Sequence, residues 1–321
     1  AFYYDSMGVP VSPVGVVTVQ ETKAPTGYTL DNSVTDSSGN AVLETQNGVT
    51  LIRFNNLWNM AIVRTSNGVE VGPDNPIAVK EQVIRGGVTV GKNDSETDKN
   101  SPQGGATFEG ATFQIISLNA NDVVVEGRTY GNGQVVKTFE IAEGETSWRS
   151  AADLLPYGNY RIVEIDSPEG YLLMGTTQKD FAITYDGQMV DLTGTNAIED
   201  DVIRGGVRIE KRDAENRDTT PQGGATLTGG TYAITTLNDS DVVVEGHTYS
   251  KGQVVKTATI PAGQTYWESA ADLLPYGHYS VIETDSPLGY LLPDDLEATE
   301  FQIEEDGVIV DLTGEHNAFF D

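Results

Sequence analysis

The sequence predicts an all-β chain made of three β-sandwich domains in tandem. Short runs of valine, threonine, isoleucine and tyrosine alternate with polar residues and are bounded by glycine, asparagine and aspartate, which is typical of strands joined by turns. Helical periodicity is nearly absent. Long stretches recur 119 positions apart, such as "DVVVEG" at Asp122 and Asp241 and "SAADLLPYG" at Ser150 and Ser269. A repeat of that length is a whole domain.

These repeats divide the chain at 84 and 203. Residues 84–202 and 203–321 are near copies, and residues 1–83 form a weaker relative. In that first unit "VVTVQETKAPTGYTL" matches "YRIVEIDSPEGYLL" of the second, but only 15 residues precede it. We therefore expect a partial first domain whose front half is missing. The junctions "AVKEQVIRGG" and "NAIEDDVIRGG" contain no Pro/Ser-rich spacer, which predicts stiff joints.

Composition excludes several classes of protein. The 321 residues include 19 Lys and Arg against 48 Asp and Glu, a net charge of −29 that disfavours nucleic acid and anionic membrane surfaces. No cysteine and no run of 18 apolar residues occur, so neither disulfides nor a membrane-inserted segment is expected. The three histidines occupy no repeated position, and neither a metal nor a cofactor is predicted. The opening "AFYYDSMG" is unlike a signal peptide and favours a fragment of a longer protein.

In two predicted strands, a lysine lies on the same face as apolar residues that are expected to be buried. In "GGVTVGKND" and "GGVRIEKRD" the lysine falls in phase with the apolar residues, and side chains two apart share one face of a strand. The two sets are Val88, Val90 and Lys92, and Val207, Ile209 and Lys211.

A glutamate shows the same phase on a later strand. Glu164 is in phase with Tyr160 and Ile162, and Glu283 holds the same place in the third unit. A carboxyl group that points into a core is costly unless it is paired or protonated. Each glutamate therefore needs either a partner or a bound proton inside its domain.

The last strand supplies a third polar residue. Val190, Leu192, Gly194 and Asn196 alternate in phase, after a predicted hairpin with Asp186-Gly187 at its turn. The third unit is one residue longer here, so strict alternation points His316 inward, and a β-bulge is needed to restore Asn317. Asp191 and Asp311 are rival candidates, although both fall on the opposite face.

Together these motifs resemble the Cna B-type domains, also called SpaA-type or prealbumin-like domains, of Gram-positive surface adhesins and pilins. The resemblance rests on K-x-D on a first strand, "GAT" soon after it, Y-x-(I/V)-x-E-x-x-x-P-x-G-Y, and a closing DG…V-D-L…N. It implies an Ig-like, transthyretin-like β-sandwich with a spontaneous isopeptide bond. A lysine on the first strand would join an asparagine or aspartate on the last, assisted by a buried acid. By position, these residues are Lys92, Glu164 and Asn196, and Lys211, Glu283 and Asn317.

The proposed bond follows from the environment of the groups. Burial disfavours the charged form of an amine and exposes its lone pair, and burial keeps a carboxyl group protonated. Glu164 and Glu283 would polarise the asparagine carbonyl and shuttle the proton to departing ammonia. Two simpler interpretations stay open: a lysine at a solvated strand end, and a buried Lys–Glu ion pair with no covalent bond.

The function expected from this sequence is structural. The chain would be the stalk of an extracellular, cell-wall-anchored adhesin or pilin, and its only chemistry would be a single self-reaction rather than enzymatic turnover. The alternative is a module that binds a host extracellular matrix protein or a glycan. Its site would lie in the first domain, because residues 32–68 have no counterpart in the other units.

Overall fold

The computed structural model describes residues 23–29 and 82–321, apart from 174–177, 295, 315–318 and 321. Elsewhere before residue 82 it describes only the backbone of short strands. The described part of the chain contains strands, turns and one 3-10 turn, and no α-helix. No helix in that part is long and apolar enough to cross a membrane. The prediction of an all-β chain is therefore confirmed.

The second unit is a sandwich of two sheets. One sheet has the order β17-β12-β23-β20, and the short strands β18 and β22 also pair with β12. The other has the order β16-β13-β19-β21. The bounds of the first sheet are β12 Arg85–Asp94, β17 Ser147–Arg149, β18 Leu155–Pro156, β20 Tyr171–Leu172, β22 Gln188–Leu192 and β23 Ile198–Val202. The bounds of the second are β13 Thr112–Ser117, β16 Val135–Glu140, β19 Gly158–Asp166 and β21 Gln178–Ile183.

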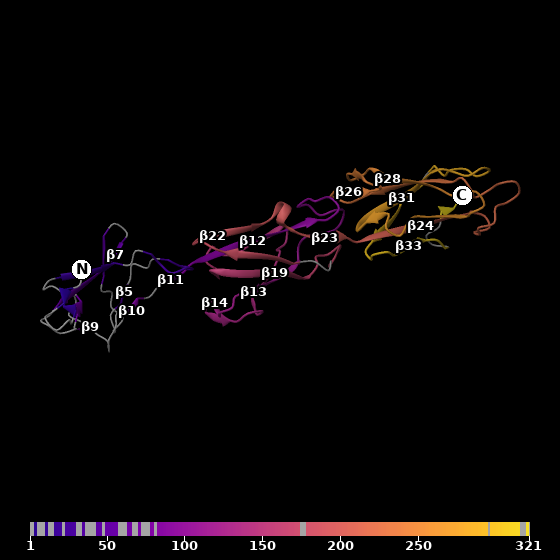
Figure 1. Cartoon of the computed structure of the whole chain (residues 1–321). Helices are drawn as coiled ribbons and strands as arrows, with labels where there is room; N and C mark the ends of the chain where they lie inside the picture. Colours follow the sequence, from indigo (N-terminus) through magenta and orange to yellow (C-terminus); the bar gives the residue numbers. More distant parts are fainter. Residues whose placement is uncertain are drawn as a thin grey trace.

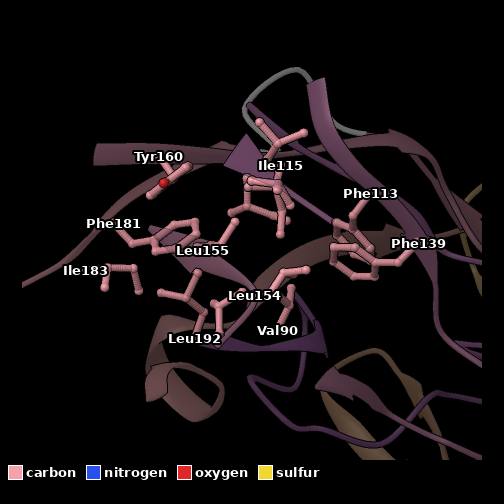
Figure 2. Packing of buried hydrophobic residues seen from close by; sticks show 14 of the residues in the cluster. Val90, Phe113, Ile115, Phe139, Leu154, Leu155, Tyr160, Phe181, Ile183 and Leu192 are labelled. Atoms are coloured by element: carbon pink, nitrogen blue, oxygen red, sulfur yellow. The ribbon is translucent and has the colours of Figure 1, made fainter. Parts of the chain in front are cut away.

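The core of the second unit lies between these sheets. Alternation buries one face of each strand, as the pattern in β13 shows, where every second residue is buried. Val90, Phe113, Ile115 and Tyr160 are fully or almost fully buried there. Figure 2 shows side chains from the facing strands pointing toward one another, with Phe113 and Phe139 together and Tyr160 beside Phe181. A hairpin, β14 Val123–Val125 with β15 Arg128–Tyr130, lies at the side.

The first and last strands of this unit run parallel. β12 pairs with β22 over its first half and with β23 over its second half, both in parallel register. The predicted hairpin around Asp186-Gly187 is wrong, because β21 belongs to one sheet and β22 to the other. Alternation marks a half-buried strand but does not identify its partner, so a corner between two sheets reads like a hairpin.

The third unit repeats this architecture. Its first sheet is built on β24 Arg204–Arg212, which pairs with β29 Tyr266–Glu268, β30 Leu274–Pro275, β33 Ile309–Leu312 and β34 Phe319–Phe320. The second sheet has the order β28-β25-β31-β32, with bounds Val254–Thr259, Thr231–Thr236, Gly277–Asp285 and Thr299–Ile303. A hairpin again lies at the side, β26 Val242–Val244 with β27 His247–Tyr249.

In the first unit the structure describes a sheet of five strands, in which β7 pairs with β3, β6 and β8, and β8 pairs with β9. Three two-stranded pairings accompany it, β1 with β2, β5 with β10 and β4 with β11. The bounds are β1 Tyr3–Tyr4, β2 Pro10–Val11, β3 Val16–Gln20, β4 Tyr28–Thr29, β5 Val34–Thr35, β6 Leu43–Gln46, β7 Val49–Asn56, β8 Val63–Thr65, β9 Glu70–Val71, β10 Ala78–Val79 and β11 Gln82–Val83.

The second and third units lie end to end (Figure 1). One residue, Ile203, separates the last strand of one from the first strand of the next. The chain therefore passes between domains without a flexible spacer, as its sequence predicted.

Candidate functional site

The lysine of the second unit is buried in the core, as its phase on the strand predicted. Val88, Val90 and Lys92 are all 0% exposed. Glu164 is buried on β19, in line with Tyr160 and Ile162. Phe113 lies opposite Glu164 across the β13–β19 ladder, and its ring centroid is 5.9 Å from Lys92 Nζ. The two charged side chains are thus held against an apolar wall rather than at a solvated strand end.

Lys92 contacts two carboxyl groups. Its Nζ lies 2.7 Å and 2.5 Å from the two carboxyl oxygens of Glu164. It also lies 2.7 Å from Oδ2 of Asp200, on β23. The side chains of all three residues are 0% exposed. Water is therefore excluded from a cluster of one amine and two carboxyl groups.

Burial changes the protonation of both acids. Desolvation is the largest influence on Glu164 and raises its pKa to about 7, although the nearby Lys92 charge acts in the opposite direction. Desolvation likewise raises the pKa of Asp200, again against the attraction of Lys92. The charge of Asp200 also raises the pKa of Glu164. Interacting acids share protons as a unit, so Glu164 and Asp200 titrate together.

Asn196, the predicted acceptor, does not belong to this cluster. β22 ends at Leu192, and a 3-10 turn, Gly194–Asn196, follows before β23 begins at Ile198. The side chain of Asn196 is exposed on that turn. Alternation counted from Leu192 does not carry across a turn, so the predicted position was wrong. The rival Asp191 is exposed as well, and it accepts hydrogen bonds from Thr193.

The sequence did contain a signal for Asp200. Ile198, Asp200 and Val202 are buried alternately along β23, so an acid stands in phase between two apolar residues. This is the same signature that identified Lys92. It was missed because the strand was thought to run on from Val190 without a break.

The third unit repeats the lysine–glutamate pair. Lys211 and Glu283 are buried, and Nζ lies 2.6 Å from Oε2. β24 and β34 pair in parallel, with Lys211 opposite Phe319, as Lys92 lies opposite Ile198. The predicted acceptor Asn317 lies outside the described residues. Asp321 follows Phe319 by two positions, as Asp200 follows Ile198, but it too lies outside the described residues. The rival Asp311 is exposed.

The family of the second unit is shown by its sequence. Residues 88–198 match the model of the SpaA family, described as a prealbumin-like fold domain. The second unit is a SpaA-type prealbumin-like domain. This SpaA-type match begins at Val88 on β12 and ends at Ile198, the first residue of β23. The third unit has the same order of strands, apart from a counterpart of β20, and nearly the same sequence.

Solved structures also align with this chain. The TIE protein of Bacillus anthracis aligns with a TM-score of 0.52 and 21% identity, over 96% of this chain and 43% of that one. This chain thus spans less than half the length of that protein. A streptococcal ancillary pilin aligns at 19% identity, over 84% of this chain and 78% of that one, with a TM-score of 0.27. A C-terminal fragment of the pilus adhesin SpaC from Lactobacillus rhamnosus GG gives 17% identity, 69% and 87% coverage and a TM-score of 0.33. No curated protein sequence matches the chain.

Three other parts of the sequence were considered as sites: metal-binding groups, the acidic loop after β12, and residues 32–68. Within the described residues no group of histidine, aspartate and glutamate is arranged to hold a metal ion. The acidic loop after β12 is not a free cluster of carboxylates, because the Asp94 side chain accepts hydrogen bonds from Thr97, Gln103 and Tyr171. Residues 32–68, where a ligand site was expected, have no described side chains.

Proposed function

We propose that this chain is a structural stalk segment of a bacterial cell-surface adhesin or pilin, crosslinked within its domains by self-formed isopeptide bonds. The observation that carries the proposal is the buried cluster of Lys92, Glu164 and Asp200. It joins the first strand of the domain to the last strand. The acceptor in the second unit is Asp200.

The reaction is an amide condensation. Glu164 takes a proton from the ammonium of Lys92, and the neutral amine then attacks the carboxyl carbon of the protonated Asp200. A bond forms between Nζ and that carbon, and one bond from the carbon to oxygen breaks. The surplus proton of the amine passes through Glu164 to the departing hydroxyl, which leaves as water.

Two features of the site favour this step. The amine and the acceptor are held in contact, which gives a very high effective concentration. The raised pKa of Asp200 favours its protonated form, which is open to attack, and the raised pKa of Glu164 makes its carboxylate a stronger base toward the Lys92 ammonium. Each cluster reacts once, so the chain is not an enzyme with an external substrate.

The third unit would react in the same way. Lys211 and Glu283 repeat the amine and the acid. Asp321 is the acceptor that corresponds in sequence to Asp200, and Asn317 is the acceptor first expected from the sequence. The two differ in the molecule released, because an aspartate loses water and an asparagine loses ammonia.

A stalk function fits the arrangement of the domains. The second and third units follow each other with a single residue between their strands. A crosslink between first and last strand would let tension pass through the domain without unfolding it. We place the protein outside the cell, in the cell wall, and assign contact with a host matrix protein or glycan to other parts of the full-length protein.

The intact mass of the chain tests the proposal. With both bonds formed through aspartates, the chain is lighter than its sequence by two molecules of water. Peptide mapping should recover Lys92 and Asp200 in one branched peptide. A mass equal to that of the sequence would refute the crosslink, and a loss of ammonia would return the acceptor role to an asparagine.

A further inference from the structure

The joint between the second and third units is built around a glycine turn and a tyrosine. The turn Pro168–Tyr171 of the second unit packs against Tyr276, which opens the long strand of the third. Ile203 N–H donates to Gly170 O at 2.8 Å, and Tyr276 N–H donates to Ile203 O at 2.8 Å. A Cβ placed on Gly170 would lie 2.9 Å from the Tyr276 ring. The turn therefore needs glycine for this approach as well as for its φ of +84°.

The joint between the first and second units uses the same parts. Ile84 N–H donates to Gly27 O at 2.8 Å, and Tyr157 N–H donates to Ile84 O at 2.7 Å. A Cβ on Gly27 would lie 2.9 Å from the ring of Tyr157. Because both joints contain the same contacts, these contacts are a repeated feature of the domain and not a chance arrangement.

Polar groups complete the joint between the second and third units. Gln103 donates through Nε2 to Asp94 and Glu96, and its Oε1 accepts from Val243 N–H at 2.9 Å. Glu96 accepts from Arg204 Nη2 at 2.7 Å. A negative face on one domain therefore meets an arginine on the next.

The third unit carries the same docking face at its far end. Gln222 Nε2 donates to Asp213 at 3.0 Å and to Glu215 at 3.1 Å, and Tyr290 OH donates to Asp213 at 2.8 Å. These contacts reproduce those of Gln103 and Tyr171. Gly289 has a φ of +92° and repeats Gly170. We call the set Glu215, Gln222, Gly223, Gly224, Leu288 and Gly289 the exit face.

The exit face is exposed where its counterpart is covered. Gln222 and Gly223 are exposed, whereas Gln103 and Gly104 are buried under the third unit. Leu288 is 76% exposed at the position of Glu169, whose carboxylate accepts from Tyr276 OH at 2.6 Å. Hydrogen bonds from the Asn216 backbone and from Gln222 and Tyr290 lower the pKa of Asp213 to about 2, so this face is negative at neutral pH.

We call the groups that meet this face in the existing joint, Arg204, Val243 and Tyr276, the entrance face. We propose that the exit face of the third unit docks the entrance face of a further domain of the same type. That partner would bring an arginine to Glu215, a strand N–H to Gln222 and a tyrosine ring to Gly289. A second copy of this chain fits poorly, because its described entrance tyrosines, Tyr157 and Tyr276, are already covered by glycine turns of their own chain. The proposal goes beyond the stalk function and does not depend on the isopeptide bonds.

The test is an extended chain in which residues 201–321 are repeated directly after Asp321. This register reproduces the natural junction, because Lys211 pairs with Phe319 as Lys92 pairs with Ile198. Hydrogen exchange is then compared with that of the unextended chain. The amides of Gly223 and Gly224 should exchange at about one tenth of the rate or more slowly still. The reason is that Gly104 and Gly105 N–H donate to Asp241 O and Tyr276 O in the existing joint.

Two controls define the result. Glu215→Lys in the extended chain should restore fast exchange, whereas Glu300→Lys, at an exposed acid on β32, should not. Unchanged exchange in the extended chain would overturn the proposal. So would concentration-dependent protection of Gly223 and Gly224 in the unextended chain, which would make a second copy the occupant. Intact mass, read on the same samples, reports the crosslinks separately.

Discussion

Asp200 reaches Lys92 from the neighbouring parallel strand, with Oδ2 2.7 Å from Nζ, although the backbone register places Lys92 opposite Ile198. The acid therefore lies two residues beyond the register partner of the lysine. The long lysine side chain spans that offset inside the core. This diagonal contact connects the first and last strands of the domain through a buried ion pair.

Replacing the acceptor should abolish the bond in the second unit alone. Each mass is compared with that of the variant's own sequence: Asp200→Ala should be lighter by one condensation only, in the third unit, whereas Asn196→Ala should keep the crosslink of the second unit as well. Asp200→Asn should still react, with loss of ammonia, and reach the same final mass as the crosslinked unsubstituted chain, because either acceptor leaves the same amide. Intact mass and tryptic mapping, each carried out on all three variants, measure these outcomes. An uncrosslinked Asn196→Ala chain would reinstate Asn196.

The crosslink should also stabilise its domain strongly. It closes a loop from residue 92 to residue 200, and the chain-entropy estimate for a loop of that length is roughly 4–5 kcal/mol. Asp200→Ala should lower the urea midpoint of the second unit accordingly, with an added cost for the buried lysine left beside one acid. Equal midpoints for Asp200→Ala and Asn196→Ala would argue against any covalent contribution.

Glu164 should act on the rate of the reaction and not on the product. Glu164→Gln keeps the shape of the side chain but cannot take up the proton of Lys92, so crosslinking should slow by about 10²–10⁴-fold. The third unit serves as an internal control, because its own acid is Glu283. Mass measured over time after cell-free synthesis would follow both units, because a bond that has once formed survives unfolding in urea. Crosslinking of the second unit at the normal rate would remove Glu164 from the mechanism.

The pH dependence of stability should reveal the buried acids in Lys92→Met, which cannot crosslink. Desolvation keeps the pKa of Glu164 above its unfolded value of 4.5, and removing the lysine removes the attraction that lowers it. The folded state then binds more protons than the unfolded state from about pH 4.5 to at least about pH 7. The free energy of unfolding should therefore fall as the pH rises through this window, by roughly 3 kcal/mol or more for Glu164. Urea midpoints at pH 5 and pH 8 measure it, and a midpoint that rises with pH would contradict the assignment.

The contact between the second and third units should depend on Gly170. A matched substitution at Gly187 separates this effect from the backbone strain that alanine causes at a positive φ. Gly170→Ala adds a Cβ that would lie 2.5 Å from Ala106 Cβ and 2.9 Å from the Tyr276 ring. Gly187→Ala also introduces strain at positive φ, but nothing lies within 4 Å of its added Cβ. We expect both to lose some stability and only Gly170→Ala to speed hydrogen exchange at Gly105. Equal exchange in both variants would show that the turn does not hold the joint.

Much of the site could be predicted from the sequence because burial follows strand phase. Lys92 and Glu164 each stand in line with apolar residues on an uninterrupted strand, and the structure buries both. Asp200 was missed because a 3-10 turn resets the phase between Leu192 and Ile198. Alternation does not reveal which distant strands pair, so the pattern around Asp186-Gly187 predicts a hairpin where the structure has a corner between two sheets. The polar contacts of the joints, such as Gln103 with Val243, depend on two domains meeting and leave no local pattern.

The joint has a consequence for how such a chain can change its length over generations. Each repeat carries a glycine turn at one end and a matching tyrosine at the other, so both partners of a joint are encoded within one stretch of 119 residues. Duplicating that stretch of gene in frame inserts a domain whose two ends already fit its neighbours. Copy number can then vary without any new contact having to evolve, whereas a duplication of another length would leave a turn without its tyrosine.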